Sequence, residues 1–438
     1  MRGRIILGAL MNAMCVVALY GQSDAGPRKG AAPPPEDSLK LTRVAAIALA
    51  LARNPQLEIA REQTAQFRAI QVQARAFPDP AVTASLDQQR GLFRSSAGGE
   101  RNIGAGLSIP FPDKFRLRNN VAAGDVGAAE ASYAALRTQI AAQTADSYDN
   151  LLLAIRHRSD ITTSRGLAED FLKRTQARFQ AGTVPRLDVI KANVDVAKAT
   201  NDLISNDRDI SNARSALARL LGAPLGTPIS PADSLGIPGE FPSLDLLEQV
   251  ALTRRQELAG ITAQRRGAGS ATTLAREFWL PDLTLGVNRD VSPGTPPAAF
   301  STGLAFPLPL LPWQHTSGEI AQAQHREREL AASERDIRAA IGEDVRTAYA
   351  TASAALRQAI YIRDQLLPAA REAFRAVSAS YSIGGSSAFE VIDARRTLLD
   401  AESQYSEALA AANTSRSELE RAIGAPLESV APGQNDAK

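Results

Sequence analysis

The chain has 438 residues, of which 44% are hydrophobic and 22% are charged, a balance that excludes disorder as its main state. The formal charge is only +2 and includes Arg2 and Arg4, so nothing indicates nucleic acid as a partner. One Cys and three His leave little material for a disulfide framework or a metal site, and 5% aromatic residues suit long, closely packed helices better than a bulky core.

Residues 1–22 are predicted to be a secretory signal peptide. Arg2 and Arg4 form a basic start, and a largely apolar stretch follows from Ile5 to Tyr20. A retained membrane anchor is the alternative, and Cys15 lacks a convincing lipobox. After this segment there is no run of 18 apolar residues, so a helical membrane protein is excluded and any crossing must use strands.

A segment of about 200 residues occurs twice, with the same landmarks in the same order. We therefore predict repeat 1 over residues 39–225, a linker rich in Pro, Gly and Ser over 226–242, repeat 2 over 243–427 and a disordered tail over 428–438. The paired landmarks are Leu51 to Arg53 with Leu252 to Arg254, Ala74 to Asp79 with Ala275 to Asp282, Gly106 to Pro112 with Gly303 to Pro309, Phe179 to Ile190 with Tyr381 to Ile392, and Leu221 to Leu225 with Ile423 to Leu427.

Each repeat is predicted to contain a helix, two strands, a long helix and a shorter helix. In repeat 1 the first helix should cover residues 39–77 and end before Pro78, and a loop through 90–100 should join strands over 81–89 and 102–109. A helix over 112–181 follows, since no strong helix breaker interrupts it. In repeat 2 the strands should cover 282–290 and 298–306.

The predicted strands alternate apolar and polar residues, as Val82, Thr83, Ala84 and Ser85 illustrate. Their length of about nine or ten residues is what a tilted strand needs to cross a bilayer. Ordinary half-exposed hairpins are the alternative. Four strands cannot close a barrel and lipid tolerates no open edge, so either the hairpins are in water or several copies of the chain share one barrel.

The long helix favours the shared barrel, because about 70 residues at 1.5 Å each form a rod on the order of 100 Å, too long for a globular domain. In repeat 2 a coiled-coil seam is predicted, and Pro368 should bend that helix at the place where repeat 1 has Gly166. Ile360, Leu367, Phe374 and Tyr381 recur every seven positions. Leu356, Ala370 and Val377 supply the complementary position, where Arg363 interrupts the row and makes the seam imperfect.

Over residues 39–427 the pattern resembles the TolC-like outer-membrane factors. The resemblance rests on paired Gly-x-x-x-x-x-[Asp/Glu]-Val-Ile segments at 182–190 and 384–392, Gly-Ala-Pro-Leu endings of both repeats, and proline-rich strand exits at 109–114 and 306–310. It implies an α+β fold in which long antiparallel α-helical hairpins form a coiled-coil tunnel. Four strands per chain would complete a trimeric, twelve-stranded transmembrane β-barrel, with an internal twofold repeat.

The resemblance also implies where the working residues lie. The hairpin tips would meet a periplasmic adaptor (membrane fusion) protein, although they could serve only as helix caps; they comprise Gly182, Thr183, Val184, Pro185, Gly384, Gly385, Ser386 and Ser387. Asp188, Glu390 and Asp393 would ring the periplasmic aperture, with ordinary solvated helix charges as the alternative. The repeat 1 counterpart of Asp393 is Lys191, so only one carboxylate is retained there.

The implied function is the channel-tunnel of a tripartite efflux system in the outer membrane, with its tunnel in the periplasm. A homotrimer in outer-membrane lipid would be a passive exit duct for an inner-membrane pump of the resistance-nodulation-division type or an ATP-driven exporter. The alternatives are a type I protein secretion duct and a periplasmic coiled-coil scaffold without a pore. No catalytic set, cofactor motif or metal site supports an enzyme.

The cargo is left open between a metal ion, a drug and a protein. The segments 308–314 and 318–321 are similar to the heavy-metal cation efflux branch of the family. Where that branch typically has Arg-Asn-Gln, however, this chain has Trp313-Gln314-His315. Trp279 and Trp313 flank the strands of repeat 2, and either lipid-interface anchoring or core packing would explain them.

Overall fold

The computed structural model describes residues 39–86, 101–291, 300–306 and 316–430. Contacts divide the chain into the units Met1–Asp37 and Ser38–Lys438, and only the second contains described residues. The predicted signal peptide, Cys15, the loop 90–100, Trp313 and most of the predicted tail therefore lie outside the described part. Of that tail, Glu428 and Ser429 belong to the short helix η3 (Leu427–Ser429).

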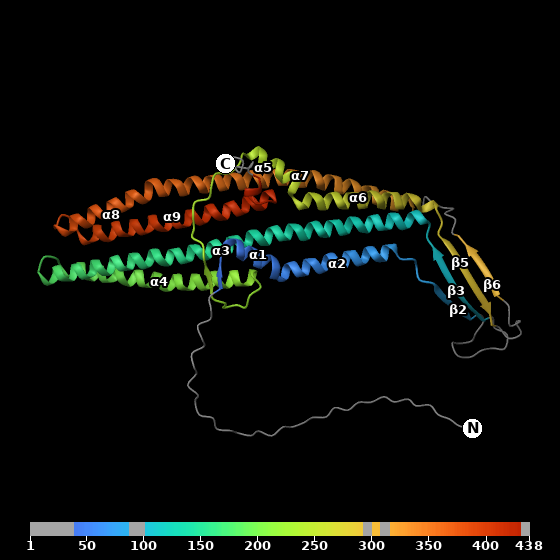
Figure 1. Cartoon of the computed structure of the whole chain (residues 1–438), viewed down its shortest axis with the longest axis horizontal. Helices are drawn as coiled ribbons and strands as arrows, with labels where there is room; N and C mark the ends of the chain where they lie inside the picture. Colours follow the sequence, from blue (N-terminus) through green and yellow to red (C-terminus); the bar gives the residue numbers. More distant parts are fainter. Residues whose placement is uncertain (1–38, 87–100, 292–299, 307–315, 431–438) are drawn as a thin grey trace, which may run out of the picture. The chain divides into compact units, whose positions relative to one another are not determined.

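Helix α3 organises the first half of this unit. It has 69 residues, which at 1.5 Å per residue gives a length of about 100 Å, and it confirms the predicted long helix. Shorter helices pack along it (Figure 1). In chain order the helices of this half are α1 (Arg43–Arg53), α2 (Pro55–Arg75), α3 (Pro112–Gln180) and α4 (Arg186–Leu220).

The second half has the same order of helices, with two additional short elements. The counterpart of α3 contains a π-helical turn, η2 (Ile362–Leu366), which ends two residues before Pro368, where a bend is predicted. No such turn occurs at Gly166, which lies inside α3. The helices are α5 (Leu244–Arg254), α6 (Gln256–Arg276), η1 (Glu277–Trp279), α7 (Thr316–Tyr361), η2 (Ile362–Leu366), α8 (Leu367–Ser382) and α9 (Ala388–Ile423).

The prediction of one unbroken helix over residues 39–77 is wrong. Leu39–Leu41 form strand β1, and the helix breaks at Asn54, whose side-chain oxygen accepts a hydrogen bond from the backbone of Gln56 at 2.9 Å. Pro55 then occupies the first position of α2, where its missing N–H costs nothing. The Asn54 side chain also donates to the Leu220 carbonyl at 3.0 Å, which ties this break to the end of α4.

Part of the predicted linker is also a strand. Ile229–Pro231 form β4, which pairs in parallel with β1, and Ile229 is buried. Each strand has only three residues, too few for a recognisable alternation of apolar and polar side chains.

The four predicted strands form one antiparallel sheet in the order β2-β3-β5-β6. Its strands are β2 (Ala81–Leu86), β3 (Arg101–Ile109), β5 (Leu283–Asp290) and β6 (Phe300–Ala305). Figure 1 shows β3 leading directly into α3, so one end of the sheet adjoins the helices.

The strand register places apolar side chains on one face of this sheet and polar ones on the other. Across β3, β5 and β6, Ala105 pairs with Val287 and Val287 with Thr302, whereas the next row joins Gly104, Asn288 and Ser301. Since directly paired residues point to the same face, the rows alternate in character. The apolar face is exposed, and its exposed members include Val82, Ile103, Leu283, Leu285, Val287, Phe300 and Leu304.

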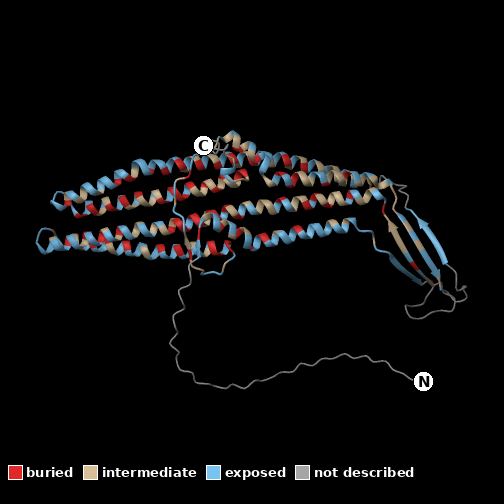
Figure 2. Cartoon of the chain, viewed as in Figure 1, coloured by how far each residue is buried: buried red, intermediate tan, exposed pale blue. Residues whose placement is uncertain are grey.

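Buried residues recur along the helices (Figure 2), and their side chains form clusters shared by several helices. Tyr148, Ile140 and Leu217 belong to a core shared by α1, α3 and α4, and Ile341, Val345 and Leu419 to a matching core of the second half. Most residues of the predicted coiled-coil seam are buried or half-buried, Leu367 and Tyr381 at 6% exposure each, whereas Ile360 is 37% exposed. Among the described residues, no helix is long and apolar enough to cross a bilayer.

Candidate functional site

The first hairpin tip joins α3 to α4 over Ala181 to Pro185. Gly182 has a φ of +73°, a left-handed conformation that favours glycine, and the amide of Thr183 donates to the Arg178 carbonyl at 2.9 Å. Gly182, Thr183 and Pro185 are exposed, and Val184 is half-buried. The tip is therefore a glycine-terminated reversal whose residues face outward.

The second tip has the same reversal and a stronger start to its next helix. Gly384 has a φ of +85°, and the Gly385 amide donates to the Ser380 carbonyl at 2.9 Å. Ser387 then caps α9: its hydroxyl accepts from the Glu390 amide at 3.3 Å, while the Ser387 amide donates to the Glu390 carboxylate at 2.9 Å. Ser386 donates to the Ser380 hydroxyl at 2.8 Å.

Tyr381 joins the two tips. The Arg178 guanidinium donates to the Tyr381 carbonyl at 2.7 Å and lies over its ring, 4.6 Å from the centroid. The hydroxyls of Thr175 and Tyr381 are 3.3 Å apart, and the Phe171 ring packs on the Tyr381 ring with centroids 5.2 Å apart. The two hairpins thus end as one packed unit within a single chain.

The three predicted aperture acids lie near the starts of two helices: Asp188 in the first turn of α4, Glu390 in the first turn of α9 and Asp393 one turn later. Glu390 and Asp393 are exposed and Asp188 is half-buried. Glu390 has a definite structural role, because it completes the capping box of α9. Among the hydrogen bonds and ion pairs of the described residues, none joins Asp188 to Glu390 or Asp393.

Behind the tips, a buried arginine links three helices, and the sequence alone does not predict this contact. Arg395 on α9 donates to the Asp195 carboxylate on α4 at 2.5 Å and to the Ser164 carbonyl on α3 at 3.2 Å. Only 8% of the Arg395 side chain and 7% of the Asp195 side chain are exposed. Asp195 lies seven residues after Asp188, about two helical turns, so the two acids are on the same side of α4.

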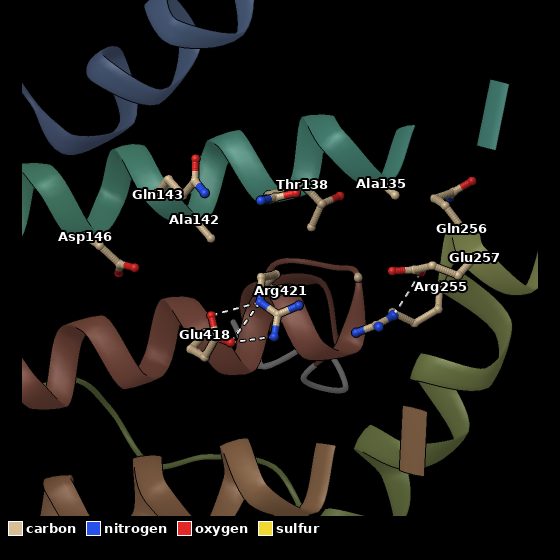
Figure 3. A pocket seen from close by; sticks show the side chains of 12 residues that line it. Ala135, Thr138, Ala142, Gln143, Asp146, Arg255, Gln256, Glu257, Glu418 and Arg421 are labelled. Carbon is tan, nitrogen blue, oxygen red and sulfur yellow. Dashed lines mark hydrogen bonds and ion pairs between the residues drawn. The ribbon is translucent and has the colours of Figure 1, made fainter. Parts of the chain in front are cut away.

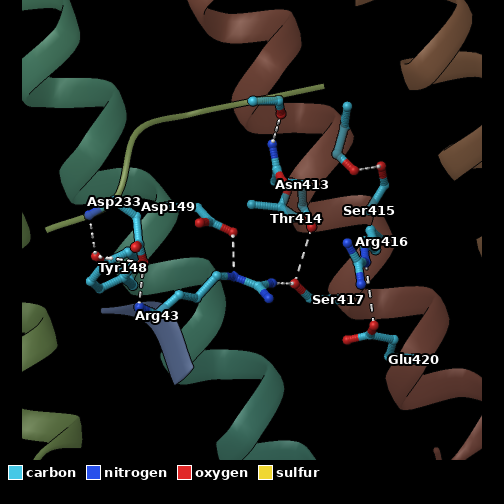
Figure 4. Close-up of polar contacts among 12 residues, drawn as sticks. Arg43, Tyr148, Asp149, Asp233, Asn413, Thr414, Ser415, Arg416, Ser417 and Glu420 are labelled. Atoms are coloured by element: carbon cyan, nitrogen blue, oxygen red, sulfur yellow. Dashed lines mark hydrogen bonds and ion pairs between the residues drawn. The ribbon is translucent and has the colours of Figure 1, made fainter. Parts of the chain in front are cut away.

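A second polar network joins α1, α3, α9 and the segment after β4 (Figure 4). The Arg43 guanidinium donates to the Asp149 carboxylate at 3.3 Å and to the Ser417 hydroxyl at 2.5 Å. The Arg43 amide donates to the Asp233 carboxylate at 2.6 Å, and the buried Tyr148 hydroxyl donates to the same carboxylate at 3.1 Å. Burial raises the pKa of Asp149 to about 6, although Arg43 acts in the opposite direction.

A cavity of about 350 Å³ lies beside this network, between α3, the start of α6 and the end of α9. Figure 3 shows Asp146 on α3 facing Glu418 and Arg421 on α9. Burial, followed by the negative charges of Asp149 and Glu418, raises the pKa of Asp146 to about 7. Arg421 donates to Glu418 at 2.8 Å. Among the described residues, no group of three or more His, Cys, Asp and Glu could hold a metal ion.

Comparison with known proteins identifies the family. The chain is 26% identical over 419 residues to the cobalt-zinc-cadmium resistance protein CzcC of Cupriavidus metallidurans, over 92% of this chain and 94% of that protein. It is 24% identical to the pyoverdine export outer membrane protein OpmQ of Pseudomonas putida, over 85% and 83% of the two chains. The outer-membrane channel OprN has the same fold, with a TM-score of 0.75 at 18% identity over 88% of this chain and 90% of OprN.

The family model of the outer membrane efflux proteins matches residues 46–223 and again residues 247–425. These two segments contain both tips, the three acids at the starts of α4 and α9, and the four strands of the sheet. The chain therefore belongs to the outer membrane efflux protein family and is a TolC-like outer-membrane channel.

Proposed function

We propose that three copies of this efflux channel assemble into one duct, each contributing its four-stranded sheet to a twelve-stranded barrel in the outer membrane. The observation that carries the proposal is the exposed apolar face of the sheet, which includes Val82 and Leu304 at 79% and 61% exposure. A face of this kind is stable against lipid and costly in water. The polar face, with Asn288 and Ser301, would then line the lumen.

The two edge strands support the trimer. Within the described residues, β2 pairs only with β3, and β6 only with β5, so each has one free edge. Unpaired backbone groups are too costly in hydrocarbon, and pairing β6 of one copy with β2 of the next would satisfy them.

The internal twofold repeat is supported by the equal lengths of matching helices. Helices α1 and α5 have 11 residues each, and α2 and α6 have 21 each.

The helices would form the periplasmic tunnel, and the joined tips would meet the adaptor protein of the tripartite system. The exposed tip residues Gly182, Thr183, Gly384 and Gly385 support this role, because an adaptor must contact an accessible surface. The inner-membrane pump is proposed to be of the resistance-nodulation-division type or an ATP-driven exporter.

The periplasmic aperture is proposed to be lined by acids. Asp188, Glu390 and Asp393 of each copy would surround the axis of the trimer at its periplasmic end, where repeated carboxylates favour cations.

A divalent metal cation is the proposed cargo. CzcC, which is named for cobalt, zinc and cadmium resistance, aligns over nearly the full length of both chains and supports this choice. Protein secretion is the second candidate. Deleting the gene should lower the concentration of cadmium or zinc that cells tolerate, whereas loss of a secreted protein with unchanged metal tolerance would favour the second candidate.

Neighbouring residues on opposite faces of β5 provide a direct test of the barrel. Val287 is 49% exposed on the apolar face, and Asn288 is exposed on the polar face. The Val287→Asp change should abolish insertion and the heat-sensitive oligomer expected on gels, because it places a carboxylate in hydrocarbon. The Asn288→Asp change should leave both intact. Equal tolerance of the two changes, or a water-soluble wild-type monomer, would overturn the proposal.

A further inference from the structure

The apolar face of the sheet contains two arginines at one end. Ile103 pairs with Arg289, so Arg289 shares the face of Ile103, and Arg101 lies two positions from Ile103 on the same strand and face. The Val291 amide donates to the Arg101 carbonyl at 2.7 Å, which holds the ends of β3 and β5 together. Arg101 and Arg289 are thus diagonal neighbours on adjacent strands.

Both arginines lie at the end of the sheet farthest from the helices. Leu283 begins β5 next to η1, and Arg289 follows six residues later, about 20 Å along the strand. Between them on this face are Leu285 and Val287, both exposed and apolar. The arginines therefore mark the outer end of an apolar band.

Aromatic side chains occur near both ends of the sheet. Phe300 is 63% exposed, and the Arg289 guanidinium lies over its ring, 5.5 Å from the centroid. At the helical end Trp279, in η1, is 61% exposed, so it does not pack in the core of the single chain. Aromatic residues at the two limits of an apolar band are typical of the two surfaces of a membrane.

On the described part of the apolar face, the charged side chains are all positive. Among the described residues of the four strands, Arg101 and Arg289 are the charged members of the apolar face, and the neighbouring carboxylate of Asp290 belongs to the polar row with Asn102. Both arginines also interact within the chain. A guanidinium is costly in the middle of a bilayer but not at its surface, where it can bind a phosphate through two parallel hydrogen bonds.

We propose that Arg101 and Arg289, with Phe300, form a binding site for the phosphate groups of the lipid in the outer leaflet, on the outside of the barrel. The ligand class is a phosphorylated glycolipid of the lipid A type. Its phosphates bind the two guanidinium groups while its acyl chains cover Leu285, Val287 and Leu304. The site rests on the proposed orientation of the sheet, and three copies of the chain would provide three such sites.

The test uses the full-length protein reconstituted into phosphatidylcholine vesicles that contain either bisphosphorylated lipid A or the same lipid with its phosphates removed. We expect lipid A to raise the melting temperature of the wild-type protein, and dephosphorylated lipid A to have little effect. The R101Q/R289Q variant should bind lipid A about tenfold more weakly in native mass spectrometry, since two charge-assisted hydrogen-bonding groups are lost. A control with Arg61→Gln and Arg208→Gln, two exposed arginines on α2 and α4, should behave as wild type.

The outcomes separate this site from the proposed barrel. A wild-type chain that inserts into both kinds of vesicle but melts at the same temperature in each would overturn the lipid site alone. A chain that inserts into neither would overturn the barrel. If inorganic phosphate added to plain phosphatidylcholine vesicles stabilised the protein as much as lipid A does, the assignment to a lipid would be wrong.

Discussion

At the scale of single residues, the ion pair of Arg395 with Asp195 has the largest expected effect on stability. Changing Arg395 to Ala leaves the Asp195 carboxylate buried without its partner, which should cost about 3 to 5 kcal/mol of unfolding free energy. The measurement is the thermal melting of the protein in detergent at neutral pH.

Two further variants isolate the cause. Replacing both partners by apolar residues, Arg395→Met with Asp195→Leu, should restore most of the loss, because no buried charge remains. Arg396→Ala, at the exposed neighbour of Arg395, should have little effect. An Arg395→Ala protein as stable as wild type would show that the pair is not buried as described.

The raised pKa of Asp146 predicts a pH dependence of stability. The unfolded carboxyl titrates near 3.8 and the folded one at about 7, so between these values the folded chain retains a proton that the unfolded chain releases. Stability from this group therefore falls as pH rises from about 4 to about 7. A pKa difference of this size corresponds to roughly 4 kcal/mol, which partial solvent exposure reduces to about 1–2 kcal/mol.

The Asp146→Asn variant should remove this pH-dependent contribution to the free energy of unfolding. Relative to wild type, it should gain about 1–2 kcal/mol at pH 8 and much less at pH 4.5, as measured by denaturant unfolding at both values. Asp202→Asn, at an exposed position on α4, serves as the control and should show no such difference between the two pH values. A gain that is the same at both pH values would contradict the assignment to titration.

At the scale of elements, glycine sets how closely α3 and α6 approach. A Cβ on Gly124 would lie 2.9 Å from both the Ala263 carbonyl oxygen and the Gly267 Cα. Gly124→Ala should therefore cost about 1–3 kcal/mol, because backbone atoms must move. Gly166, in the same helix, has nothing within 4 Å, so Gly166→Ala should instead stabilise by about 0.5–1 kcal/mol.

Melting temperatures of these two variants provide the check. Opposite signs for the same chemical change within one helix would attribute the loss to the close approach of α3 and α6. Stabilisation of both variants would show that helix propensity, and not packing, dominates at Gly124.

The long elements could be predicted from the sequence, and the short ones could not. The helix from Pro112 ends at Gln180, within one residue of the prediction, because no breaker interrupts it. The four strands of the sheet were indicated by their alternation. The three-residue strands β1 and β4 are too short to show any period, so their pairing is set by tertiary contacts. The break before Pro55 had a local signal, an Asn followed by Pro.

At the hairpin tips, only the features that depend on local sequence could be predicted. Gly182 and Gly384 were identifiable as reversals because glycine readily adopts a positive φ. Arg178 and Arg395, in contrast, contact residues about 200 positions away in the chain. No local sequence pattern indicates how two separate hairpins are aligned, so these contacts required the structure.

At the scale of the whole molecule, the three tip acids predict a cation preference of the assembled duct. The variant D188N/E390Q/D393N should have a lower cation-to-anion permeability ratio in planar bilayers, since nine carboxylates per trimer would be lost. Glu390→Gln is chosen because glutamine can replace glutamate in the capping box, so the fold of α9 is preserved.

The matched control changes Asp202 and Asp400 to Asn, two exposed acids farther along α4 and α9. This control should retain the permeability ratio of wild type. An unchanged ratio in the triple variant would mean that these acids do not face the path of the ions, even if the trimer itself is correct.

The pairing of β1 with β4 has a consequence for the order in which the chain folds. Because Leu39 pairs with Ile229, the first half is a closed loop of nearly 200 residues whose two ends are joined by backbone hydrogen bonds. Such long-range closure is slow, since its entropy must be lost before the contact forms. The amino-terminal half therefore cannot complete its structure until the segment around residue 231 has emerged from the translocation machinery.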